Sequence, residues 1–147
     1  MKYFFFLLFT ILISVSAFAQ QKNPSFYSNE AAAWADSILK NISLEEKIGQ
    51  LFMAAAWSNK DTSLTNEIRK QITENHIGGL IFFQGGPVRQ ALLTNEYQKL
   101  SSVPLLIGMD AEWGLPMRID STVRFPRQMT LSATGNDSSV YLMGEEI

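Results

Sequence analysis

Three short, continuous apolar runs dominate the middle of the chain. They cover residues 51–56, 78–83 and 104–110. Each is too short for a buried helix, and none alternates with polar residues as a half-exposed strand does. Continuous runs of this length are typical of strands that are buried on both faces of a parallel sheet. The pattern therefore predicts three parallel strands.

Helical patterns lie between these runs. Segment 62–75 carries apolar residues at four-residue spacing, and segment 87–100 opens with Pro87, a residue type favoured at the first helical position. The predicted strands begin near residues 51, 78 and 105, a regular spacing that suits right-handed βα units laid side by side. The sequence thus predicts an α/β fold with about three βα units.

Further helices are predicted on both sides of these units. Segment 28–42 has the apolar periodicity of an amphipathic helix. Ser43 lies three residues before Glu46, the spacing of a capping box, so a new helix is expected to start there. Segment 131–147 predicts another turn and helix, with Asn136 among the candidate caps.

The first residues have the pattern of a secretory signal. Lys2 is followed by an apolar run over 3–13 and by the small-x-small sequence of 17–19. We expect a cleaved signal peptide over 1–19 and an extracytoplasmic location, either periplasmic or secreted. An uncleaved anchor is the alternative, but a spanning helix needs about 20 apolar residues. Residues 20–33 are expected to form a linker and the start of the first helix, and 34–147 the truncated N-terminal part of a larger α/β domain.

Composition excludes several classes of function. The 147 residues include 12 Lys and Arg, 14 Asp and Glu, and no basic run, so we expect no nucleic-acid partner. The absence of Cys and the presence of a single His exclude Cys-based zinc sites and thiol chemistry. We also expect no metal and no cofactor, and no membrane association after signal cleavage. His76 precedes the second strand, so it is expected on the side of the sheet associated with stability.

Candidate chemistry lies where the third strand ends. In parallel α/β folds, ligands bind at the carboxyl ends of the strands, and of the three ends only this one carries charge, with Asp110 at its tip. A carboxylate there can accept hydrogen bonds from two sugar hydroxyls, but Asp110 can equally cap a turn or pair with an arginine. Glu112 points to the same side if the chain stays extended. Arg118 offers a planar donor fork or pairs with Asp120; for Trp113, core packing is favoured over sugar stacking.

Four segments resemble a known family. Ile42–Leu51, Ile77–Phe83, Leu106–Gly114 and Phe125–Pro126 are similar, in order, to the opening of the catalytic barrel of glycoside hydrolase family 3, particularly its β-N-acetylhexosaminidase branch. The resemblance runs from about Trp34 to the last residue. It implies the N-terminal portion of a (β/α)8 TIM-type barrel from a secreted retaining exo-glycosidase. Such an enzyme removes terminal β-linked N-acetylglucosamine, or a related β-sugar, from glycans or peptidoglycan fragments.

The resemblance also implies roles for two residues. Asp110 and Arg118 match family positions that contact the terminal sugar, so both are expected to bind the carbohydrate substrate. The acid/base histidine and the nucleophilic aspartate of this branch belong to later parts of the barrel. No catalytic residue is therefore expected in these 147 residues, which we expect to be an N-terminal fragment that is inactive and does not fold alone.

Two other interpretations stay open at this point. A non-catalytic carbohydrate- or solute-binding extracytoplasmic module would also combine a signal peptide, βα units and a polar strand end. A truncated gene product without function is the third interpretation.

Trp113 stands where the family commonly has glycine, so this loop does not identify the sugar. The sequence does not predict an oligomeric state.

Overall fold

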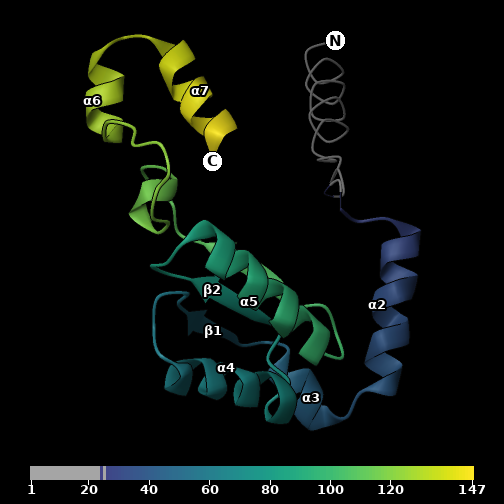
Figure 1. Cartoon of the computed structure of the whole chain (residues 1–147). Helices are drawn as coiled ribbons and strands as arrows, with labels where there is room; N and C mark the ends of the chain where they lie inside the picture. Colours follow the sequence, from purple (N-terminus) through teal and green to yellow (C-terminus); the bar gives the residue numbers. More distant parts are fainter. Residues whose placement is uncertain (1–23, 25) are drawn as a thin grey trace, which may run out of the picture. The chain divides into compact units, whose positions relative to one another are not determined.

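A computed structural model describes residue 24 and residues 26–147. The predicted signal peptide, residues 1–19, and residues 20–23 and 25 of the predicted linker segment lie outside these residues. The chain divides into two compact units, residues 1–40 and residues 41–147, and each is described by itself (Figure 1). Across the described residues, no helix is both long enough and apolar enough to cross a membrane.

The first described helix is α2 (Asn29–Asn41), which confirms the amphipathic helix predicted over 28–42. Ser28 begins it, because its hydroxyl oxygen accepts a hydrogen bond from the N–H of Ala31 at 3.0 Å. Glu30 lies in the first turn and Lys40 in the last, so both charges complement the helix dipole.

Three parallel strands form the sheet of the second unit. They are β1 (Met53–Ala56), β2 (Gly79–Phe82) and β3 (Leu106–Met109), in the order β1-β2-β3. Helix α4 (Thr62–Glu74) connects the first two strands, and α5 (Pro87–Leu100) connects the second pair. This is the predicted α/β arrangement with a parallel sheet (Figure 1).

One face of the sheet packs against the helices. The residues Ala54, Leu80 and Ile107 pair across the three strands, as do Ala56, Phe82 and Met109. These six belong to the apolar core or pack against it, together with Ile68 and Ile72 of α4 and Tyr97 of α5. Leu80 and Phe82 are fully buried, so the central strand is the middle of this core.

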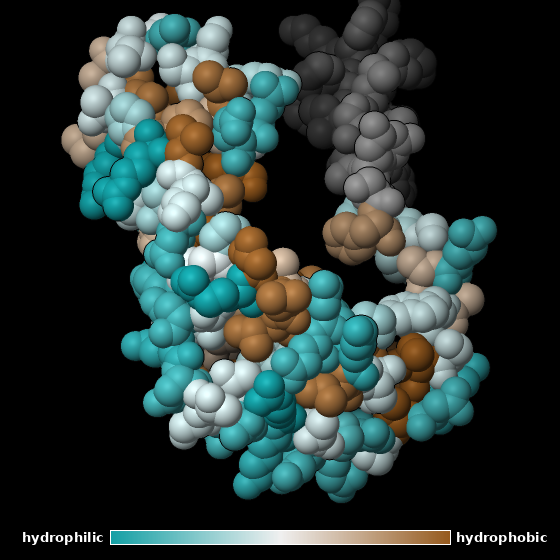
Figure 2. All heavy atoms as spheres, viewed as in Figure 1, coloured by the Kyte–Doolittle hydropathy of each residue, from teal (hydrophilic) through white to brown (hydrophobic). Residues whose placement is uncertain are grey.

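The opposite face of the sheet is open in the described chain. Met53, Gly79 and Leu106 pair across it, and Leu106 is 68% exposed while Met53 is 46% exposed. The prediction that the strands are buried on both faces is therefore wrong for β1 and β3 in the described residues, whereas Gly79 of the central strand is buried on this face. Hydrophobic side chains also form patches among hydrophilic ones on the molecular surface shown in Figure 2.

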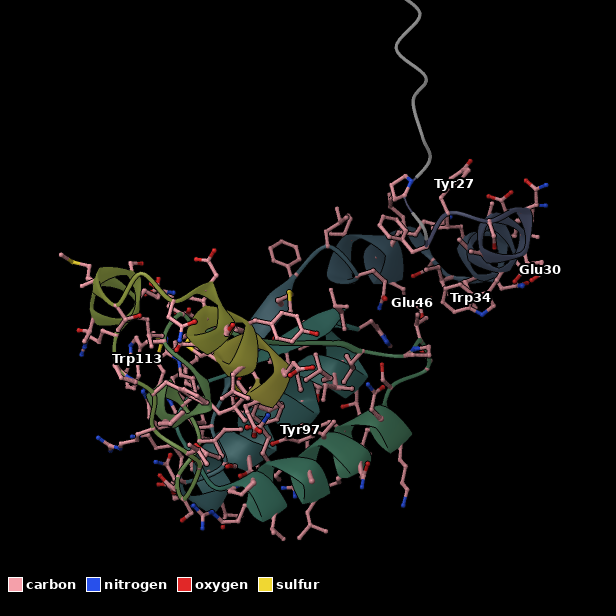
Figure 3. All side chains as sticks on the ribbon, turned by 90° about the horizontal axis from the view of Figure 1, so that it is seen from above. Tyr27, Glu30, Trp34, Glu46, Tyr97 and Trp113 are labelled. Carbon is pink, nitrogen blue, oxygen red and sulfur yellow. The ribbon has the colours of Figure 1, made fainter. Side chains whose placement is uncertain are left out.

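Helix α3 (Leu44–Gly49) starts with the predicted capping box. The Ser43 hydroxyl accepts from the N–H of Glu46 at 3.1 Å, and the Glu46 carboxylate accepts from the N–H of Ser43 at 2.7 Å. These bonds satisfy two backbone donors that the first turn leaves without helical partners. The hydrogen bond from the Ser43 backbone is the main reason why the pKa of Glu46 is lowered, with the Ser43 hydroxyl bond and His76 contributing. Figure 3 labels Glu46 on this helix.

The amino ends of the strands are held by a close backbone crossing. The Gly78 N–H donates to the carbonyls of Gly49 and Phe52 at 3.2 and 3.0 Å. A Cβ at Gly78 would lie 2.1 Å from the Gln50 carbonyl oxygen, so only glycine fits without movement. The Gln50 side chain donates to the His76 carbonyl at 2.7 Å. His76 thus lies before β2, at the end of the sheet opposite to Asp110.

The last part of the second unit holds one helix more than the sequence predicts. It contains a short 3-10 turn, η1 (Leu115–Met117), and the helices α6 (Gln128–Ala133) and α7 (Asp137–Glu146). Helix α7 begins at the predicted cap, where the Asn136 side chain accepts from the Ser138 N–H at 3.0 Å. Helix α6 was not predicted, because it has six residues and its N-cap, Arg127, makes no side-chain capping bond.

The capping box predicts a pH dependence of stability. Because folding lowers the pKa of Glu46 below 4.5, its charge stabilises the folded state above that pH, and this contribution is lost as the pH falls through the lowered value. Glu46→Gln should therefore be less stable than the wild type at about pH 6, with the difference shrinking toward about pH 3. Urea unfolding of the complete protein at both pH values measures this difference.

The control for this experiment is Glu45→Gln. Glu45 lies in the same first turn, but the capping bonds are made by Ser43 and Glu46. The difference in stability between Glu45→Gln and the wild type should change little with pH. An equal stability difference between Glu46→Gln and the wild type at both pH values would contradict the prediction.

Candidate functional site

The candidate site lies at the carboxyl ends of the three strands. Trp57 follows β1, Phe83 follows β2 and Asp110 follows β3. Because the strands are parallel and in register, these residues lie together at the carboxyl end of the sheet. The rings of Trp57 and Phe83 stack with centroids 5.2 Å apart and planes inclined by 22°. This edge therefore carries an aromatic pair beside a carboxylate.

Arg118 connects the carboxylate to the aromatic pair. Its Nη2 donates to Oδ2 of Asp110 at 2.8 Å, and its Nε donates to the Asp110 carbonyl at 3.0 Å. Its guanidinium carbon lies 4.6 Å from the centroid of the Phe83 ring, within the range of a cation–π contact. The Arg118 side chain is 12% exposed and that of Asp110 is 40% exposed. The arginine is thus fixed while the carboxylate faces outward.

The two residues chosen from the sequence therefore contact each other. Asp110 does pair with an arginine, as one interpretation of the sequence held, and that arginine is the other candidate, Arg118. The alternative that Arg118 pairs with Asp120 is wrong, because Asp120 pairs with Arg89 at 3.0 Å.

The pair keeps hydrogen-bonding capacity for a ligand. Among the residues that the structure describes, Oδ1 of Asp110 and Nη1 of Arg118 contact no other protein group by a hydrogen bond. A carboxylate oxygen only accepts and a guanidinium nitrogen only donates. A ligand with adjacent hydroxyls, which do both, is complementary to this arrangement.

The loop after β3 does not continue as an extended strand. The Gly114 N–H donates to the Ala111 carbonyl at 2.9 Å, and Gly114 has a φ of 98°, which favours glycine. The reason for expecting Glu112 beside Asp110 is therefore wrong, and the Glu112 side chain is exposed. Trp113 is half-buried rather than in the core, with the Arg127 guanidinium 5.1 Å from its ring centroid (Figure 3).

Backbone contacts join the loops that carry the site. The Gly85 N–H donates to the Arg118 carbonyl at 2.9 Å, and the Asp120 N–H donates to the Gly85 carbonyl at 2.7 Å. The Ser58 N–H donates to the Gln84 carbonyl at 3.2 Å. The loops after β1, β2 and β3 thus form one connected surface.

Hollows in the second unit do not mark this site clearly. One of about 820 Å3 is lined by mostly apolar residues of α3, β1 and α4, including Phe52, Met53 and Ile68. It extends to His76 and Ile77, at the amino ends of the strands. A hollow of about 100 Å3 is lined in part by Gln84, Arg118 and Asp120. We place the site at the carboxyl ends of the strands rather than in either hollow, because the Asp110–Arg118 pair lies there and only Arg118 of that pair lines the second hollow. Among residues 24 and 26–147, no group of three or more Asp, Glu or His could hold a metal ion.

Comparison with known families identifies the chain. Residues 43–147 match the family model described as Glycosyl hydrolase family 3 N terminal domain. The chain belongs to glycoside hydrolase family 3. The match begins at the Ser43 capping box and includes all three strands, Asp110 and Arg118.

Two curated proteins are similar to this chain over part of their length. A beta-N-acetylglucosaminidase/beta-glucosidase of Cellulomonas fimi is 25% identical over 117 residues, which are 80% of this chain and 20% of that protein. A beta-hexosaminidase of Thiobacillus denitrificans is 34% identical over 80 residues, which are 52% of this chain and 22% of that protein. This family 3 chain spans about a fifth of the length of the curated relatives that it matches.

A solved structure supports the fold of this family 3 chain. It is described as beta-glucoside phosphorylase BglX bound to 2FGlc, and it is 25% identical with a TM-score of 0.73. The alignment covers 84% of this chain and 22% of that protein. The α/β arrangement with a parallel sheet is therefore shared with a sugar-bound protein.

Sequence reasoning missed the aromatic part of the site. Trp57 and Phe83 are the first residues after their strands, so their position alone could have marked them. The search for charge at the strand ends passed over them, because an aromatic residue beside an apolar run looks like its continuation. The stacking of Phe83 on both Trp57 and Arg118 depends on the tertiary structure.

Gly85 should be sensitive to substitution. A Cβ at this position would lie 1.7 Å from Oγ of Ser58, and Ser58 is buried. Gly85→Ala must displace one of the two loops, so we expect a loss of about 1–3 kcal/mol in the free energy of unfolding. Chemical denaturation of the complete protein measures this loss.

Gly144→Ala is the matched control for Gly85→Ala. Gly144 lies in α7, and a Cβ there meets nothing within 4 Å. Alanine in a helix should leave stability unchanged or raise it by up to about 1 kcal/mol. Equal effects of the two substitutions would show that the contact between Gly85 and Ser58 is not tight.

Proposed function

We propose that this chain is the N-terminal part of the catalytic domain of a secreted retaining exo-glycosidase. Its substrate is a terminal β-linked N-acetylglucosamine, or a related β-sugar, in glycans or peptidoglycan fragments. Family membership supports glycoside hydrolysis. The single observation that carries the proposal is the Asp110–Arg118 pair at the carboxyl edge of the parallel sheet.

We assign the pair to sugar binding. Oδ1 of Asp110 accepts from one hydroxyl of the terminal sugar, and Nη1 of Arg118 donates to a neighbouring one. Phe83 and Asp110 hold the arginine side chain from two sides. A donor fixed in this way loses little conformational entropy when a ligand binds. The rings of Trp57 and Phe83 provide an apolar wall beside the polar pair.

The catalytic pair is proposed to come from later residues of the complete protein. A retaining glycosidase needs a nucleophilic carboxylate and an acid/base, typically about 5 Å apart. Asp110 is bound to Arg118, and Glu112 lies on an exposed turn. His76 precedes β2, so it lies at the opposite end of the strands. None of these residues forms the required pair.

The sheet geometry supports completion as a (β/α)8 barrel. Helices α4 and α5 contribute to one buried core with one face of the sheet. The other face carries Ala55, Ile81 and Gly108 in one row. In such barrels the helices lie outside and alternate strand residues fill the interior in layers. We infer that the open face becomes the barrel interior and that β1 and β3 pair with further strands.

The preference for N-acetylglucosamine and the location rest on different features. The four segments that resemble the hexosaminidase branch carry the first proposal, and the name of the 34% identical relative agrees with it. The other relative is named for both glucosaminidase and glucosidase activity, so β-glucosides are the natural comparison. Secretion is proposed from the pattern of residues 1–19.

Hydrolysis of chromogenic substrates tests the proposed function. The complete protein should release the chromophore from a β-N-acetylglucosaminide faster than from a β-glucoside. Residues 20–147 alone should do neither and should show no cooperative thermal transition, because the sheet has two open edges. Sugar binding without hydrolysis by the complete protein would instead indicate a non-catalytic binding module. Activity of residues 20–147 would place the catalytic pair within them.

Asp110→Asn tests the assigned binding role. The substitution keeps the shape but removes the charge that accepts from the sugar and from Arg118. A hydrogen bond to a charged group contributes about 1.5–3 kcal/mol, so kcat/KM of the complete protein should fall by about 10- to 150-fold. Glu112→Gln is the control, since this carboxylate is on the same loop but exposed, and it should change kcat/KM little. Equal losses in both variants would contradict the assignment.

A further inference from the structure

We propose that Arg89 and Asp120 are positioning residues that hold Arg118 in place for sugar binding. The proposal rests on the proposed function of Arg118 and extends it to two residues that do not contact the ligand themselves. It is carried by contacts that connect three loops through one guanidinium group.

Arg89 connects two loops from the first turn of α5. Its Nε donates to the Ser58 carbonyl, in the loop after β1, at 3.0 Å. Its Nη2 donates to Oδ2 of Asp120, in the loop after β3, at 3.0 Å. Helix α5 itself follows β2. One side chain thus fixes the separation of segments that follow three different strands.

Asp120 transmits this constraint to Arg118 through the backbone. The two residues lie on either side of Ile119, which forms a parallel bridge with Gly85. The Gly85 carbonyl accepts from the Asp120 N–H at 2.7 Å, and the Gly85 N–H donates to the Arg118 carbonyl at 2.9 Å. A shift of Asp120 therefore strains the bonds that fix the backbone of Arg118.

The exposure of the Arg89–Asp120 pair predicts that its loss affects ligand binding more than folding. The side chains of Arg89 and Asp120 are 56% and 60% exposed. Exposed ion pairs contribute little to stability, and salt screens them. The bond from Nε of Arg89 to the Ser58 carbonyl is partly buried. Loss of the pair should therefore loosen the loop after β3 while the apolar core stays intact.

The chain offers a matched control pair. Arg69 of α4 bonds through its Nε to Oε1 of Glu96 of α5, with side chains 34% and 40% exposed. It is also an arginine–carboxylate pair between segments distant in sequence, but it joins two helices rather than the site loops. Glu96→Gln removes the charge from this pair as Asp120→Asn does from the other.

The test uses Asp120→Asn and Arg89→Lys in the complete protein. Lysine keeps the charge but cannot donate from two fixed nitrogen atoms to Ser58 and Asp120. We expect KM for the β-N-acetylglucosaminide, and Ki for free N-acetylglucosamine, to rise about three- to tenfold in both variants. We expect kcat to change less than about twofold and the unfolding midpoint to stay close to the wild type. Glu96→Gln should leave KM and Ki unchanged.

A double-mutant cycle tests whether Asp120 acts on sugar binding through Arg118. If Asp120 acts through Arg118, Asp120→Asn should add nothing to the KM and Ki of Arg118→Lys, because coupled residues are not additive. Additive effects would overturn the proposal. So would wild-type values of KM and Ki in Asp120→Asn.

Hydrogen exchange separates this proposal from the proposed function. Asp120→Asn should speed amide exchange in peptides that contain Gly85 and residues 118–120, and Glu96→Gln should not. Unchanged exchange at these amides would overturn the positioning role even in an active enzyme. Faster exchange in a complete protein without glycosidase activity or sugar binding would instead overturn the proposed function, and with it the role in sugar binding.

Discussion

The register of the three parallel strands determines where the chemistry lies. Ala56, Phe82 and Met109 are direct partners across the sheet. The residues that follow them therefore lie side by side at the carboxyl ends of the strands. An aromatic side chain follows the first strand, another follows the second, and a carboxylate follows the third. Arg118 then reaches both Phe83 and Asp110. A one-residue slip of any strand would separate these groups and turn its core side chains to the other face.

Most of the secondary structure could be predicted from local sequence signals. The continuous apolar runs, Pro87 and the Ser43–Glu46 spacing each act within a few residues, so the sequence was sufficient for the strands and the longer helices. Helix α6 has no capping bond or long apolar pattern, and it was missed. Glu112 lies within a turn that the hydrogen bond from the Gly114 N–H to the Ala111 carbonyl closes, so the chain is not extended there as the prediction required.

The site was only partly predictable for a physical reason. Position at a strand end follows from periodicity, and this was enough for Asp110. The partner of a charged side chain depends on which loops meet in space, so the sequence left open whether Arg118 pairs with Asp120. In the structure, Arg118 forms an ion pair with Asp110, and Arg89 forms one with Asp120. The two pairs are joined through the backbone of Gly85.

The two ends of the sheet depend on separate sets of contacts. At the amino end, Gly78 crosses Gly49 and Gln50 binds the His76 carbonyl. At the carboxyl end, Gly85 and Arg89 join the loops that carry Arg118. Few constraints are shared between these ends, so substitutions in the loop after β3 can accumulate without weakening the amino-end crossing. Such a division favours evolvability, because a changed ligand preference need not be balanced by compensating changes in the crossing that holds the strands together.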